Sequence, residues 1–267
     1  LVPMSCGSGK YFGYFYKGTD PTVDDVVWQY GTQEYLDFCT MMKEWADQGF
    51  WSKNAVSNTT SPLDAFENGT SAALFWNLDT CESAKNVVDS EHPEWKAELV
   101  NVTPGVVHVK GVYTGDGFAI PAVSENQERA MMVLDVLKFD TTYTLGTDQA
   151  NYTVGNAPIS WGLKNDLLER IQGEAGTTQS EIRQQLMGDA ISEITSGFIF
   201  DDTAVKSELA AMNEVCSQYV PMLELGLVDD VQGTINELNE KCKTAGLEKV
   251  QQEFLDQYTA YLKNLGK

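Results

Sequence analysis

Residues 197–223 read GFIFDDTAVKSELAAMNEVCSQYVPML, and they are the most informative segment for the fold. It predicts a helix that begins at about residue 203, where Asp201 or Asp202 can cap the free backbone N–H groups, with Pro221 near the helix end. Two further helices are predicted after it, TINELNEKCKTAG and LEKVQQEFLDQYTAYLKNL, and Gly246 ends the first of them. The last part of the chain is therefore expected to be almost wholly helical.

Toward the amino terminus, helices are expected to alternate with short strands. Residues 32–48 predict a helix capped by Thr32, with apolar side chains on one face and Gly49 after its end. SPLDAFENG, residues 61–69, predicts a short helix capped by Ser61. The small-residue segment SAALFWN, 71–77, reads as a strand, and a helix follows that starts near Asp79 or Thr80.

The middle of the chain continues this pattern. Residues 95–105 predict a strand, and residues 106–121 predict a hairpin whose turn lies near 114–117. SENQERAMMVLDVLKFD predicts a helix capped by Ser124, and two more helices are expected over 161–170 and 178–195. Strands mixed with helices in the first half and helices in the second half indicate an α/β protein with a helical carboxy-terminal region.

Composition excludes several kinds of partner. The 267 residues carry 39 acidic and 18 basic side chains, a net charge of −21, which repels nucleic acid and anionic lipid surfaces. The length allows one large domain or two modest ones. No apolar run is long enough to predict a membrane span, and no secretory leader is recognisable, so we expect a mature form or a fragment.

The five cysteines are scattered, without metal-ligand spacing. We expect buried free thiols, and one disulfide remains as an alternative. Three acidic pairs, Asp24–Asp25, Asp201–Asp202 and Asp229–Asp230, are read as turns or helix caps in preference to calcium ligands.

Catalytic motifs are missing from the sequence. The two histidines, His92 and His108, lie in a polar turn and among strand valines, and no nucleophile elbow accompanies them. No zinc motif, calcium loop or dinucleotide fingerprint occurs, so neither a metal nor a cofactor is predicted. With 39 acidic residues, a glycosidase pair of carboxylates stays open as an alternative.

Aromatic residues beside polar ones give the best candidate site. Sugar sites use an aromatic ring against the apolar face of the sugar and polar side chains for its hydroxyl groups. Three clusters have this make-up in predicted loops, and core packing is the competing explanation for each aromatic residue. The candidate ligand-binding residues are Phe75, Trp76, Asn77 and Asp79, then Tyr113 and Asp116, and finally Trp161.

The order of these blocks resembles a known family. MMKEWADQGF, LDAFENGTSAALFWN and AIPAVSENQERAM, within about residues 30–140, are similar to the second half of a family 1 extracellular solute-binding protein with the type II periplasmic-binding-protein fold. Residues 197–253 resemble the carboxy-terminal domain of LipO-like lipoproteins of Firmicutes. Compared with the family, most of the first lobe and a block after residue 140 are absent.

The resemblance implies a domain plan. Residues 1–106 would belong to the carboxy-terminal lobe, 107–139 to the amino-terminal lobe, and 140–267 to a helical region packed on the carboxy-terminal lobe. The crossovers between lobes would lie near 100–104 and 140–147. By the same analogy, Trp76 takes a sugar-stacking position in a cleft between lobes that close on the ligand.

The resemblance also implies a function. The protein would be the extracellular substrate-binding component of an ABC importer, would bind a sugar or oligosaccharide, and would have the importer permease subunits as partners. Its place would be the outer face of a Gram-positive cytoplasmic membrane, through a lipid anchor outside this chain. A glycoside hydrolase-like enzyme and a surface scaffold protein without ligand binding remain the alternatives.

Overall fold

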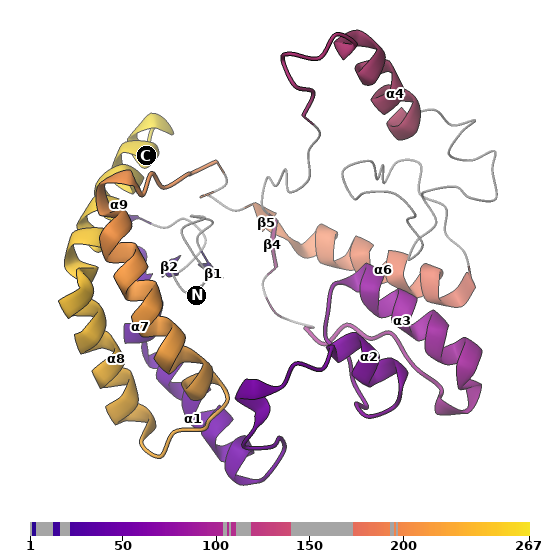
Figure 1. Cartoon of the computed structure of the whole chain (residues 1–267), viewed down its shortest axis with the longest axis horizontal. Helices are drawn as coiled ribbons and strands as arrows, with labels where there is room; N and C mark the ends of the chain where they lie inside the picture. Colours follow the sequence, from indigo (N-terminus) through magenta and orange to yellow (C-terminus); the bar gives the residue numbers. More distant parts are fainter. Residues whose placement is uncertain are drawn as a thin grey trace. The chain divides into compact units, whose positions relative to one another are not determined.

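The computed structural model of the chain divides into two compact units (Figure 1). Unit 1 combines the two ends of the chain, Leu1–Thr59 and Ser192–Lys267, and unit 2 is Thr60–Ile191. The structure describes residues 2–3, 13–16, 22–103, 106, 108–110, 119–139, 173–192, 195 and 197–267. The predicted domain boundaries after residues 106 and 139 stay predictions.

Unit 1 consists of long helices beside a small antiparallel sheet. Three strands lie in the order β1-β2-β3, and Tyr14 pairs with Trp28 in the β2–β3 register. Helices α7 and α8 run side by side, α9 follows α8 and contacts α7, and α1 contacts both α7 and α8 (Figure 1). The bounds are β1 Val2–Pro3, β2 Tyr14–Tyr16, β3 Val26–Trp28, α1 Gln33–Asp47, α7 Lys206–Glu224, α8 Val231–Ala245 and α9 Leu247–Asn264, with short 3₁₀ turns η1 Val23–Asp25, η2 Gln29–Gly31, η3 Ala55–Ser57 and η7 Thr203–Val205.

Several predicted helix ends in unit 1 are confirmed. The hydroxyl of Thr32 accepts a hydrogen bond from the backbone N–H of Tyr35, 3.2 Å away, and α1 ends just before Gly49. Gly246 closes α8 with a left-handed φ of 110°, a conformation that favours glycine. The start of α7 differs from the prediction: Asp201 accepts from the backbone N–H of Thr203 in the turn before η7, neither Asp201 nor Asp202 caps α7, and α7 itself begins at Lys206.

The predicted acidic caps are also seen. Asp25 accepts a hydrogen bond from the backbone N–H of Thr22 at 2.8 Å, and Asp230 accepts one from Gly233 at 2.9 Å at the start of α8. Each carboxylate therefore replaces a missing backbone acceptor at a turn or helix start. Together with Asp201, they confirm the turn or cap interpretation in one member of each acidic pair.

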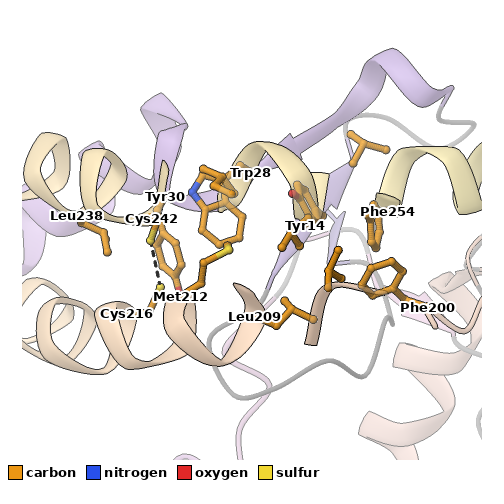
Figure 2. Packing of buried hydrophobic residues seen from close by; sticks show 14 of the residues in the cluster. Tyr14, Trp28, Tyr30, Phe200, Leu209, Met212, Cys216, Leu238, Cys242 and Phe254 are labelled. Carbon is orange, nitrogen blue, oxygen red and sulfur yellow. Dashed lines mark hydrogen bonds between the residues drawn. The ribbon is translucent and has the colours of Figure 1, made fainter. Parts of the chain in front are cut away.

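An aromatic core joins the sheet of unit 1 to its helices (Figure 2). Tyr14 of β2 stacks on Phe254 of α9, with ring centroids 4.5 Å apart. Phe198 and Phe200 contact the same Phe254 ring at 5.4 and 5.2 Å. Burial of such large rings is the main favourable contribution to folding, so this cluster holds together the two chain ends that form unit 1.

One asparagine links helix α8 to the first part of the chain. The Asn239 Oδ1 atom accepts a hydrogen bond from Trp28 Nε1 at 3.1 Å, and its Nδ2 donates to the carbonyl oxygen of Tyr30 at 2.7 Å. Both bonds connect residues more than 200 positions apart in sequence. They satisfy polar groups at the edge of the core and fix the position of α8 against β3 and η2.

The described part of unit 2 consists mainly of helices. Helix α3 contacts α2 on one side and α6 on another, and strand β4 pairs with β5. The bounds are α2 Pro62–Glu67, α3 Leu78–Glu91, η4 Pro93–Trp95, β4 Val109–Lys110, α4 Gln127–Phe139, α6 Gly173–Asp189 and β5 Ile191–Ser192. Ser61 caps α2 as predicted, because its hydroxyl accepts from the backbone N–H of Asp64.

Several predictions for this region were wrong. Residues 71–77 and 96–103 form no strand, because a strand needs a neighbour for its backbone hydrogen bonds and none of the described strands pairs with them. Helix α4 begins at Gln127, and the Ser124 hydroxyl instead accepts from the N–H of Asn126. Helix α6 begins earlier than predicted and ends at Asp189. The predicted hairpin turn and the helix over 161–170 lie outside the described residues.

Candidate ligand-binding site

The loop between α2 and α3 carries two exposed aromatic side chains. Phe75 is 82% exposed and Trp76 is 50% exposed. Large apolar side chains this open to water lose contact with it when a ligand covers them, which makes adjacent rings a favourable surface for the apolar face of a sugar. Neither ring is therefore packed in the core of unit 2.

The backbone on both sides of the two rings is fixed. Before them, the N–H of Ser71 donates to the carbonyl oxygen of Ala65 at 2.8 Å. After them, the Asn77 Oδ1 atom accepts from the N–H of Thr80 at 2.9 Å. Asn77 is thus the cap of α3, and the helix begins at Leu78, close to the predicted start near Asp79 or Thr80. The loop is short and its backbone is hydrogen-bonded at each end, which restrains the segment that carries the two rings.

The side chain of Asp79 joins α3 to α6, which lie side by side (Figure 1). Its Oδ1 atom accepts hydrogen bonds from Gln179 Nε2 and from Arg183 Nη2, the latter at 3.0 Å. The Asp79–Arg183 contact is also an ion pair between partly buried side chains. Asp79 therefore holds the first turn of α3, and with it the aromatic loop, against α6.

A buried carboxyl group lies one helical turn further along α3. Glu82 is 1% exposed, and its Oε1 atom accepts a hydrogen bond from Asn86 Nδ2 at 2.5 Å. Burial raises the pKa of the Glu82 carboxyl, and the charge of Asp79 adds to this effect. Within the described part of the chain, neither Glu82 Oε2 nor the buried Gln179 Oε1 has a hydrogen-bond partner. The interface between α3 and α6 is thus polar and sensitive to protonation.

Sequence reasoning missed three members of this interface, Glu82, Gln179 and Arg183. A signal for Glu82 exists, because Asp79, Glu82 and Asn86 recur at spacings of three and four and so share one helix face. No comparable signal identifies Gln179 and Arg183, since they lie about a hundred positions further along the chain.

The predicted site residues fall into two groups. Phe75, Trp76, Asn77 and Asp79 are consecutive or nearly so and lie together at the start of α3. Tyr113, Asp116 and Trp161 lie outside the described residues, so their place relative to the first group stays a prediction.

Neither a metal site nor a catalytic arrangement of the histidines accompanies this loop among the described residues. Among the described residues, no three His, Cys, Asp or Glu side chains are grouped to hold a metal ion. His92 stacks on Trp95 with centroids 4.0 Å apart, and His108 Nε2 lies 3.0 Å from the Thr103 hydroxyl. Within the same ranges, no helix combines the length and hydropathy needed to cross a membrane.

The fold is of the type II periplasmic-binding-protein class, mainly its carboxy-terminal lobe with a largely helical tail. The crystal structure of the N-glycan transport solute-binding protein NgtS from Streptococcus pneumoniae superposes on 97% of this chain and 60% of its own, with a TM-score of 0.71 and 21% identity. The same protein in complex with Man1GlcNAc gives a TM-score of 0.57 at 20% identity, over 89% of this chain and 57% of its own.

Sequence comparison gives a consistent result. A carbohydrate ABC transporter substrate-binding protein of Streptococcus pneumoniae serotype 4 is 28% identical over 168 residues, which cover 55% of this chain and 34% of that protein. Residues 194–263 match the family model described as a domain of unknown function, DUF3502. That match overlaps the tail for which a family resemblance was noted. This chain spans about a third of the curated relative.

Proposed function

We propose that this chain is part of the substrate-binding component of an ABC importer and binds a sugar or oligosaccharide without turning it over. The observation that carries the proposal is the anchored, exposed Phe75–Trp76 pair at the start of α3, in a chain with a solute-binding fold. The relatives named above are transport proteins for carbohydrates by their descriptions, which favours binding over catalysis.

The proposed site residues have two roles, stacking on the sugar ring and positioning the loop that carries the stacking residues. Phe75 and Trp76 supply apolar faces for the sugar ring, in the interlobe cleft of the intact receptor. Asn77 already caps α3, and Asp79 already accepts a hydrogen bond from Arg183 of α6. We therefore assign both residues mainly to positioning the loop. Tyr113, Asp116 and Trp161 are proposed as further ligand contacts, with polar groups for the sugar hydroxyls.

The ligand class can be narrowed by the structural neighbour. NgtS was crystallised with Man1GlcNAc and with Man5GlcNAc. We therefore propose glycans of mannose and N-acetylglucosamine as the first ligands to test on this protein. The low sequence identity supports shared fold alone, so a sugar of another kind is an equal member of the same screen.

The setting follows from the same proposal. The protein would lie outside the cell, held at the cytoplasmic membrane of a Gram-positive bacterium by a lipid anchor outside these 267 residues. It would deliver its ligand to the permease subunits of the importer. The strong net charge of −21 suits a soluble receptor surface that does not adhere to anionic lipid.

A thermal-shift screen of the full-length protein against mono- and oligosaccharides tests the function. A ligand at a hundred times its Kd should stabilise the protein by about 2.7 kcal/mol, a clear rise in Tm. Chromatography of the same mixtures should recover the glycan unchanged. Released product would favour the glycoside hydrolase alternative, and the absence of stabilisation by any glycan would favour a scaffold protein.

A further inference from the structure

Two cysteines meet in the core of unit 1, on neighbouring helices (Figure 2). Cys216 lies on α7 and Cys242 on α8, and their sulfur atoms are 3.8 Å apart. Both side chains are buried, at 1% and 0% exposure, and both are free thiols in this structure. A contact of this length places the sulfurs at van der Waals separation, in reach of an S–H···S hydrogen bond and close enough to be joined as a disulfide by an external oxidant.

The surroundings hold the pair together. Helices α7 and α8 pack against each other, and Tyr30, Met212 and Leu238 belong to the same core cluster (Figure 2). Residues 225–230 join the two helices directly. The thiols therefore meet through the packing of two helices that are neighbours in sequence, so that bringing them together closes only a short loop of chain.

We propose that Cys216 and Cys242 are a redox-sensitive pair that becomes an interhelical disulfide when the protein folds in an oxidising medium. The extracellular setting rests on the proposed function, whereas the chemistry of the pair does not. A low-molecular-weight disulfide such as oxidised glutathione is the oxidant. One cysteine thiolate attacks it to form a mixed disulfide and release one glutathione thiol, and the second thiolate then displaces the other. Two protein S–H bonds are lost, one S–S bond forms, and the oxidant leaves as two thiols.

Burial decides when this reaction occurs. The hydrogen bond to Cys242 and the apolar core raise the pKa of Cys216, while the same hydrogen bond lowers the pKa of Cys242, and the thiolate is the reactive form. In the folded protein the pair is also out of reach of a dissolved oxidant. Oxidation therefore occurs during folding, when α8 has packed on α7 but the rest of the core does not yet cover the two sulfurs, and the finished disulfide resists reduction until the unit opens.

The other described cysteines provide a comparison. Cys39 of α1 is buried in the same core cluster, and Cys81 of α3 lies in unit 2, partly buried, with its sulfur 3.8 Å from the carbonyl oxygen of Leu74. Cys39→Ala is thus a matched control, because it removes a buried sulfur from the same core without touching the pair.

The test is refolding of the full-length protein in a glutathione redox buffer and, separately, in excess dithiothreitol. Peptide mapping without reduction should identify a Cys216–Cys242 cross-link in the first sample. Because the disulfide restrains the unfolded chain, the oxidised sample should melt about 5–10 °C higher than the reduced one.

The variants separate the pair from general core effects. Cys216→Ala and Cys242→Ala should each abolish the difference in Tm between the two buffers, while Cys39→Ala should keep it at a lower overall Tm. The proposal is overturned if both thiols are alkylated after denaturation of the oxidised wild-type sample, or if mapping finds Cys216 or Cys242 joined to another cysteine. Mapping of the wild-type protein decides the matter even if a variant fails to fold.

Discussion

At the start of α3, side chains a few residues apart have different roles. Phe75 and Trp76 are open to water, Asn77 caps the helix, and Asp79 binds Gln179 and Arg183 of α6. A ligand stacked on the rings therefore rests on a loop whose position depends on polar contacts beneath it. Changes at these contacts should affect stability first and binding through it.

The contacts of Asp79 with Gln179 and Arg183 predict an effect of this residue on stability. Asp79→Ala leaves the buried amide of Gln179 and the Arg183 guanidinium without this acceptor, which should cost about 1–3 kcal/mol of unfolding free energy. Asp64→Ala is the control, since Asp64 is an exposed acidic residue in the first turn of α2. Urea unfolding of both variants measures the difference. Equal small losses of unfolding free energy in the two variants would contradict a stabilising role of the Asp79 contacts.

Glu82 predicts a dependence on pH. Burial raises the pKa of this carboxyl above its ordinary value of 4.5, while Asn86 and Lys85 oppose the shift. Because the folded pKa is the higher one, the stability gained from the protonated form is complete below pH 4.5 and is lost as pH rises through the folded pKa. Glu82→Gln should therefore raise Tm at neutral pH and leave it nearly unchanged at acid pH. A Tm gain that is the same at both would rule this out.

The sequence identified candidate residues at the start of α3 but not the role of each one. Phe75, Trp76, Asn77 and Asp79 could be chosen because aromatic and polar residues adjoin before a helix. Their roles could not be assigned, because exposure and the partners of Asp79 depend on α6. A contact between positions 79 and 183 leaves no local pattern in the chain.

At the scale of elements, caps were predictable and isolated strands were not. Thr32, Ser61 and Asp230 cap helices through bonds to the backbone three residues on, so local sequence suffices to find or explain them. Residues 71–77 have the composition of a strand, but a strand exists only when a partner strand supplies hydrogen bonds. That partner is a property of the fold and not of the segment.

Two glycines test how closely α1 approaches the end of α7. Gly226 has a φ of +63°, and a Cβ atom added there would lie 2.3 Å from the carbonyl oxygen of Met42. Gly49 has a φ of +79° with open space around it. Gly49→Ala should cost only the left-handed strain, about 1–2 kcal/mol, and Gly226→Ala clearly more because backbone must move. Chemical denaturation that ranks Gly49→Ala as equal or worse would contradict the packing.

At the scale of the whole molecule, unit 1 is formed by the two ends of the chain. Strands β2 and β3 near the amino terminus pack on α9 near the carboxy terminus through Tyr14 and Phe254. The sequence predicted the helices of this unit and its α/β class, and the family resemblance predicted its fold. It gave no means of seeing that residues 1–59 and 192–267 share one core.

The shared core predicts a large effect for one ring. Phe254→Ala removes a fully buried side chain that contacts Tyr14, Phe198 and Phe200, so unit 1 should lose about 3–5 kcal/mol. Phe75→Ala removes the same side chain from an exposed position and should change stability little. Guanidinium unfolding followed by near-ultraviolet circular dichroism measures both. Similar losses in the two variants would contradict the assignment of Phe254 to the core.

Calorimetric titration of the full-length protein with mannose–N-acetylglucosamine glycans, and with the best glycan of the screen, tests most directly whether the aromatic loop at α3 binds a carbohydrate. We expect saturable binding that Trp76→Ala weakens about tenfold with little change in Tm. Trp95→Ala is the matched control, a partly exposed tryptophan of the same unit that stacks on His92. It should bind as the wild type does. Binding that Trp76→Ala leaves unchanged, or no binding of any glycan, would contradict the account.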